Sequence, residues 1–387
     1  MANLLESIKR LVTPVMPLSP GIYHYQAPPD VPTPYRLHLR LEPDGSGLLI
    51  VNASTVLHLN QTAAELAYHL VKQTPEDQIV REITGRYRVN RQHAIQDYQQ
   101  LQERILTLIH SPDLDPESFL DFERSTPYSK KVSAPYRLDC AVTYRVSGTT
   151  DVSLAPTKRV ERELSTEEWF GVFDKAWNFG IPHIVLTGGE PTLREDLPAL
   201  IAHTEANGQV VGLLSDGLRL IDHDYLETLL QTGLDHLMIS IDPENPDSWK
   251  ALYNALSADI FVVVHLTVNL QNVMNTSHMM ERLMNMGVKA ISISASDPAL
   301  HGSIIQLRNH AAELGMSLVW DLPVPYSAFN PVGIETQVDS PVSGTGHAWL
   351  YVEPDGDVLP AQGVNQVLGN ILKDTWETIW QLPGVTI

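Results

Sequence analysis

The chain has 387 residues, 43% hydrophobic and 19% charged, which is ordinary for a globular protein of two or three domains. Its formal net charge of −20, with no basic stripe, argues against a nucleic-acid partner. The single cysteine, Cys140, excludes an internal disulfide and any iron–sulfur or zinc site built from several thiolates of this chain.

Residues 1–33 are interpreted as an N-terminal extension. The apolar residues near its start share one helical face, but the stretch is too short and too charged for a secretory signal. No apolar run approaches the roughly 20 residues that cross a bilayer. We therefore expect a cytoplasmic protein with no membrane partner.

Residues 34–110 are predicted to form a small winged-helix-like α+β domain with a three-stranded sheet. "YRLHLRLEPDGSGLLIVN" is typical of two strands around a turn, and "STVLHLNQTAAELAYHLV" of a third strand that passes into a helix capped by Asn60. Two more helices follow, the second over residues 92–109. Residues 111–135, rich in proline, serine and charge, are predicted to be a linker.

Residues 136–325 alternate between strand and helix patterns. Strands are expected at 137–144, 183–187, 210–215, 236–241, 260–268 and 289–294, with another at 317–321. A capping box formed by Ser165 and Glu168 starts the first helix between them, and Gly180 ends it. This alternation predicts an α/β fold with a parallel sheet, open or curled into a barrel. Residues 326–387 form a C-terminal region with the hairpin "AWLYVEPDGDVLPA" and a short helix.

The strongest local motif is "HIVLTGGEPTLREDLPALI". Its strand ends at Thr187, two glycines open a turn, and Glu190 follows at the carboxyl edge of the sheet, where ligands bind. Glycine lets the backbone approach a ligand closely, and a fixed carboxylate suits an ammonium group. On that interpretation, removing the Glu190 carboxylate leaves the fold intact. A tight turn with a solvated glutamate explains the same letters equally well.

The "GGEP" sequence resembles the motif of radical S-adenosylmethionine enzymes that receives the methionine amino group. "LLSDG" is similar to the third-strand "TNG" of that family, and "ISID" to the fourth-strand "S-x-D". The resemblance implies a partial (β/α)6 barrel that can bind S-adenosylmethionine. The implied binding residues are Gly188, Gly189, Glu190, Pro191, Ser215, Asp216, Ser240, Asp242 and Asn269.

Both ends of the chain extend the resemblance. The C-terminal stretch that begins "GHAWLYVEPDGDVLPA" is similar to the auxiliary-cluster region called SPASM or twitch. Residues 34–110 resemble the peptide-chaperone domain of pyrroloquinoline-quinone biosynthesis, a RiPP recognition element. This resemblance implies a precursor peptide as partner, bound as an added strand at an open edge of the sheet. Residues 1–33 would block that edge if they lay along it.

The cluster-binding cysteines of the family are replaced. In the family, the first strand ends in Thr-Tyr-x-Cys and continues as Cys-x-x-x-Cys-x-x-Cys, and the three cysteine positions become Val146, Thr150 and Ser153 here. The cysteine expected after the C-terminal turn is replaced by Ala361. Cys140 is predicted to pack inside its strand as a small apolar group. We therefore expect no iron–sulfur cluster, and without one there is no route to the adenosyl radical.

Three functions stay open. The first is a pseudoenzyme that binds a peptide and supports or regulates its maturation by a catalytically active radical S-adenosylmethionine enzyme. The second is a non-radical enzyme or sensor that still binds S-adenosylmethionine, or a similar ligand, at Glu190. The third is a stand-alone peptide-binding protein. The sequence names no acid–base pair for the second function, and each of its fifteen histidines is expected to be exposed or packed.

Overall fold

The computed structural model describes residues 15–28, 30–111, 132–148, 153–337 and 343–380. The chain divides into two compact units, Met1–Lys131 and Val132–Ile387. Each unit has its own hydrophobic core. Thr150, one of the replaced cluster positions, lies outside the described residues.

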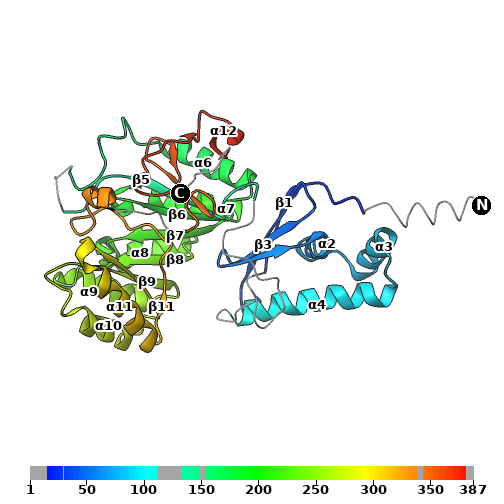
Figure 1. Ribbon diagram of the computed structural model, residues 1–387, viewed down its shortest axis with the longest axis horizontal. Helices are drawn as coiled ribbons and strands as arrows, with labels where there is room; N and C mark the ends of the chain where they lie inside the picture. The colour runs from blue at the N-terminus through cyan, green and yellow to red at the C-terminus, as the bar shows by residue number, and fades with distance from the viewer. Residues whose placement is uncertain (1–14, 29, 112–131, 149–152, 338–342, 381–387) are drawn as a thin grey trace, which may run out of the picture. The chain divides into compact units, whose positions relative to one another are not determined.

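The first unit is an α+β structure built on an antiparallel sheet. Its strands are β1 (Gly21–Gln26), β2 (Arg36–Leu41), β3 (Gly47–Val51) and β4 (Thr55–Leu59), in that order across the sheet. Its described helices, blue to cyan in Figure 1, are α2 (Gln61–Val71), α3 (Glu76–Arg86) and α4 (Arg91–His110). Asn60 caps α2 as predicted, because its side chain accepts a hydrogen bond from the Ala63 N–H at 3.0 Å.

The prediction of three strands was wrong, because β1 comes from the stretch interpreted as an extension. It pairs antiparallel with β2, from Gly21 opposite Leu41 to Gln26 opposite Arg36. The Tyr23 ring packs edge-on against Tyr68 of α2, with 4.8 Å between ring centroids. These contacts are long-range, so the proline-rich local sequence gives little sign of them. One edge of the predicted sheet is therefore covered by the chain itself.

The second unit is an α/β structure whose central strands are parallel, which confirms the predicted fold class. Six strands alternate with helices: β5 (Arg137–Thr143), β6 (His183–Gly188), β7 (Val210–Ser215), β8 (His236–Ser240), β9 (Phe261–Val268) and β10 (Ala290–Ala295). The helices between and after them are α6 (Thr166–Asn178), α7 (Leu197–Asn207), α8 (His223–Gln231), α9 (Pro246–Leu256), α10 (Thr276–Asn285) and α11 (His301–Glu313) (Figure 1). The predicted box of Ser165 and Glu168 caps α6.

The sheet of this unit is open in the part of the chain that the structure describes. Its order is β11-β10-β9-β8-β7-β6-β5-β12-β13-β14, with β11 (Ser317–Leu318) at one edge. At the other edge, β12 (Trp349–Val352) runs parallel to β5, and β13 (Asp357–Leu359) and β14 (Gly369–Asn370) pair antiparallel. Helix α12 (Trp376–Trp380) follows, as predicted. Parallel strands bring their carboxyl ends to one edge, which is where the predicted site residues lie.

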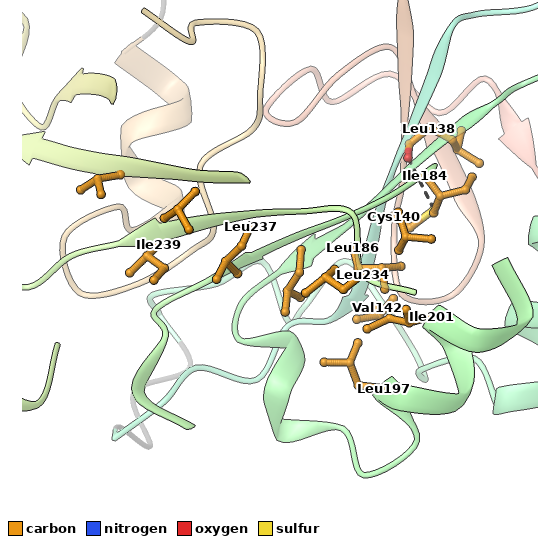
Figure 2. Close-up of a cluster of buried hydrophobic side chains, with 14 of the residues drawn as sticks. Leu138, Cys140, Val142, Ile184, Leu186, Leu197, Ile201, Leu234, Leu237 and Ile239 are labelled. Carbon is orange, nitrogen blue, oxygen red and sulfur yellow. Dashed lines mark hydrogen bonds between the residues drawn. The ribbon is translucent and has the colours of Figure 1, made fainter. Parts of the chain in front are cut away.

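The largest core lies between the sheet and the helices, and it contains Cys140. Figure 2 shows this side chain among Leu138, Val142, Ile184 and Leu186, with its thiol directed at the Leu138 carbonyl. The side chain is fully buried, and burial raises the pKa of the thiol well above its usual value. Cys140 therefore packs as predicted. A neutral thiol inside an apolar core is a poor metal ligand.

Successive side chains of a strand point to opposite faces of the sheet, so every second one points away from this core. The face on which those side chains lie is called the inner face below. Near its middle, Val185, Leu214, Met238, Val263 and Ala290 form a small buried apolar cluster. In the described parts of the chain, no helix is long and apolar enough to span a membrane.

Candidate functional site

The two glycines after β6 lie directly against the backbone that follows β5. A Cβ atom on Gly188 would stand 2.2 Å from the Thr143 carbonyl oxygen, and one on Gly189 would stand 2.1 Å from that of Arg145. The Gly189 N–H donates to the Thr143 carbonyl at 2.8 Å, and the Glu190 N–H donates to that of Arg145 at 2.7 Å. Glycine is required here because the chain's own backbone approaches so closely.

Glu190 is buried, which contradicts the interpretation as a solvated turn residue. Only 3% of the residue is exposed. One carboxylate oxygen accepts hydrogen bonds from the N–H and hydroxyl of Thr192, at 2.9 and 2.6 Å, and from the Ser215 hydroxyl at 2.9 Å. The other oxygen accepts from the Asp216 N–H at 2.7 Å. The side chain therefore joins the turn after β6 to the turn after β7.

The charge on Glu190 has no cationic partner among the described residues. Burial, reinforced by the nearby Asp216 carboxylate, raises its pKa to about 8 although its hydrogen bonds act in the opposite direction. A buried carboxylate without a counterion is costly in its charged form. A cationic ligand at this turn would lower that cost.

The remaining predicted binding residues lie at the carboxyl ends of neighbouring strands and largely cap their own turns. Asp216 accepts from the Leu218 N–H at 2.9 Å, and Asp242 accepts from the Glu244 N–H at 3.0 Å. Asn269 accepts from the N–H groups of Gln271 and Asn272, both at 2.9 Å. The structure brings Glu190, Ser215 and Asp216 into contact. Ser240 follows Ile239, which is opposite Ser215, but Ser240, Asp242 and Asn269 form no hydrogen bond or ion pair with that group in the described structure.

The described cluster positions hold no metal-binding side chains. Val146 packs against a buried cluster that contains Tyr144, Tyr326 and Tyr351. Ser153 is exposed and Ala361 is half-buried. Together with the buried Cys140, these positions supply no accessible thiolate, so the residues present do not fit an iron–sulfur cluster.

An ionic network borders the three tyrosines. The Tyr144 hydroxyl donates to Glu353 at 2.8 Å, and the Arg159 guanidinium lies 3.2 Å from the same carboxylate. Arg159 also pairs with Glu335 at 3.4 Å and donates to the Tyr326 hydroxyl at 3.2 Å. Side chains that precede β6 and side chains that follow β11 thus contact one another next to Tyr144, which directly follows β5 and precedes position 146 of the expected cluster loop.

Sequence reasoning missed one constellation on the inner face. His265 of β9 lies within hydrogen-bonding distance of three hydroxyl groups, from Thr267, Ser292 and Ser294. The ring is fully buried, and burial lowers its pKa to about 4. These partners are two residues away on β9 or on the next strand, so no spacing along the sequence marks them as a group.

Comparisons with known proteins agree with this geometry. Residues 140–257 match the family model described as the radical SAM superfamily, a stretch that includes Val146, Glu190, Asp216 and Asp242. The PqqA peptide cyclase of Rhizobium meliloti (strain 1021) is 26% identical over 252 residues, which are 57% of this chain and 66% of that protein. The Granulibacter bethesdensis enzyme of the same name is 30% identical over 151 residues, 35% of this chain and 40% of that protein. The matched segments thus span less than two thirds of either relative.

Solved structures show the same fold. Streptococcus suis SuiB bound to its precursor peptide SuiA has a TM-score of 0.58 at 13% identity, covering 88% of this chain and 86% of that one. SuiB bound to S-adenosylmethionine has a TM-score of 0.56 at 14% identity, covering 89% of this chain. Residues 140–257 therefore match the radical SAM superfamily, and the chain shares the overall fold of SuiB.

Proposed function

We propose that this chain is a cluster-less, radical-SAM-like pseudoenzyme that binds a precursor peptide and supports its maturation by a catalytically active enzyme. The observation that carries the proposal is Val146, which packs against buried tyrosines where the family has a thiolate. The fold is retained while the ligands for its redox chemistry are not. A retained fold without those ligands suits binding rather than radical formation.

The first unit supports the peptide part of the proposal. Its sheet has two outer strands, and β1 covers the edge of β2. In the described part of this unit, β4 has β3 as its one strand neighbour. Its outer N–H and C=O groups can pair with an extended peptide, as in strand addition. Similarity to SuiB, whose structure contains a precursor peptide, supports the same role.

We expect a precursor peptide encoded beside this chain to protect the backbone amides of residues 55–59 from hydrogen exchange. Proline at Val56 and proline at Leu57 test the edge directly, because successive N–H groups in a strand point to opposite sides. Leu57 is a buried core residue, so Leu57→Ala is the control for the loss of its side chain. Compared with that control, or with the parent for Val56, the variant that removes an outward N–H should fold and lose most of its peptide affinity. The variant that removes a bond to β3 should destabilise the unit. Protection confined to β1, or two folded variants that bind as well as the parent, would contradict the role of β4.

We expect the protein, reconstituted with iron and sulfide without oxygen, to hold no iron–sulfur cluster and to leave S-adenosylmethionine uncleaved under a strong reductant. The reason is the missing thiolates, so the Cys140→Ala variant should give the same metal content as the parent. Stoichiometric iron and sulfide with a cluster absorption band would overturn the pseudoenzyme proposal. The purified chain must be tested alone, because another protein's cysteines would complicate the result.

A second candidate function rests on the uncompensated charge of Glu190. The pKa of about 8 marks a buried carboxyl group that a cation would stabilise in its charged form. A sensor or non-radical enzyme that binds S-adenosylmethionine or a similar cation fits this feature. In the same anaerobic experiment, calorimetric binding of S-adenosylmethionine without cleavage would favour this second function.

A further inference from the structure

The carboxyl ends of β9 and β10 bring a histidine and three hydroxyl groups together on the inner face. The Nδ1 atom of His265 lies 3.0 Å from the Ser292 hydroxyl. Its Nε2 atom lies 3.1 Å from the Ser294 hydroxyl and 3.2 Å from that of Thr267. The strand register explains the arrangement, since His265 is opposite Ser292 and Thr267 is opposite Ser294.

The burial of these groups changes along the strand. His265 is fully buried and Ser292 nearly so, whereas Ser294, two residues nearer the carboxyl edge, is half-buried. That edge is where parallel α/β sheets bind their ligands. The only hydroxyl of β10 that is both partly exposed and in contact with the ring is therefore the one nearest that edge.

We propose that Ser294 is a nucleophile activated by His265, with Ser292 holding the ring, and that the site reacts with carboxylic esters or thioesters. A hydroxyl, a base within hydrogen-bonding reach and a third group that orients the base are the arrangement by which a serine is activated. Here the orienting group is a hydroxyl in place of a carboxylate. This assignment is independent of the peptide and cluster proposals.

The proton movements follow from the two ring nitrogens. With Nδ1–H donating to Ser292, Nε2 carries no proton and can accept one from either nearby hydroxyl, Ser294 or Thr267. Thr267 is buried and Ser294 is half-buried, so Ser294 is the hydroxyl that a substrate can reach. The Ser294 oxygen then forms a bond to the acyl carbon, the bond to the leaving group breaks, and Nε2 returns the proton to that group. A water molecule attacks the acylated serine in the second half, again losing its proton to Nε2 and restoring the hydroxyl. The His265 ring is neutral at pH 7 and can accept a proton, and its lowered pKa makes it a weaker base than a free imidazole.

A fluorophosphonate probe tests the assignment on the full-length chain. The Ser294 oxygen bonds to phosphorus, fluoride leaves, and the released proton passes to Nε2. We expect one probe per chain, located by mass spectrometry on the peptide that contains Ser294. Ser294→Ala should abolish labelling, and His265→Gln should slow it at least about 100-fold, the usual contribution of a general base. Labelling elsewhere, or none, overturns the proposal.

Two further variants, together with a folding check, distinguish activation of Ser294 by His265 from mere solvent exposure of a serine and from a loss of folding. Ser296 lies two residues beyond Ser294 and is also half-buried, so Ser296→Ala should label at the parent rate. Ser292→Ala keeps the nucleophile and the base but removes the hydroxyl at Nδ1. It should therefore change the pH at which labelling is half-maximal, which a purely structural role of Ser292 would leave unchanged. If His265→Gln is folded by circular dichroism and labels at the parent rate, His265 does not activate Ser294 and the proposal fails.

Discussion

Glu190→Ala is expected to lower the free energy of unfolding of residues 132–387 by about 2–4 kcal/mol. The substitution leaves the N–H groups of Thr192 and Asp216 without their acceptor in a buried turn. An unsatisfied buried donor costs about 1–3 kcal/mol, and the two hydroxyl donors can partly relax by rotation. Urea denaturation followed by tryptophan fluorescence measures the loss. All seven tryptophans lie between residues 169 and 380, so the signal reports this unit alone.

Glu195→Ala is the matched control. Its carboxylate lies five residues away and is 88% exposed, with one weak ion pair to Arg219 at 3.5 Å. Such surface pairs contribute at most about 1 kcal/mol, so the control should stay close to the parent. Equal stability of the two variants would show that the donors around Glu190 find other partners. It would also return Glu190 to the minor structural role that the sequence suggested.

The stability of the same unit is expected to peak near pH 6.5. Burial lowers the pKa values of His236 and His265 from 6.5 in the unfolded chain to about 4 in the folded protein. Their contribution to folding stability is therefore fully present at pH values above 6.5. That stability is lost as the pH falls toward 4, by about 1.4 kcal/mol per unit for each group. Asp139, whose pKa burial raises to about 6, and Glu190, whose pKa burial raises to about 8, oppose much of this loss. Burial also lowers the pKa of His183 well below its usual value, and this adds to the loss, so stability still falls on the acid side.

Above pH 6.5, the titration of Glu190 determines how the stability changes with pH. Its pKa is raised from 4.5 to about 8, so the folded state binds more protons than the unfolded state and loses stability as the pH rises through 8. Between pH 6.5 and 8 the loss is about 2 kcal/mol, at about 1.4 kcal/mol per unit. Urea denaturation at several pH values checks both limbs. The Glu190→Gln variant should lack the alkaline limb, and an unchanged alkaline limb in that variant would assign it to another group.

The local sequence predicts many of the regular helices and strands of this protein well. Residues 210–215 form a strand with the predicted bounds, because buried apolar runs bounded by turns are clear signals. The helix caps at Asn60 and Ser165 are also confirmed, since a cap depends on residues within one turn.

The features that sequence reasoning missed depend on contacts between distant segments. Strand β1 forms because it pairs with β2. Its own residues are flanked by prolines, so the local sequence does not mark it as a strand. Glu190 is buried because donors at the carboxyl end of the next strand, Ser215 and Asp216, converge on it. His265 meets Ser294 because two strands are in register. A side chain's role at a sheet edge is therefore set by its neighbours across the sheet, which no single motif contains.

The position of Val146 among the tyrosines has a consequence for any change toward a cluster site. Replacing Val146 by cysteine would exchange two methyl groups in that packing for one sulfur atom before any iron could bind. Two more cysteines, at positions 150 and 153, would be needed before three thiolates were present together. If the chain is cluster-free as proposed, a single cysteine at residue 146 would change this packing without completing a set of three thiolates. The packing around residue 146 would therefore favour valine until all three cysteines were present together.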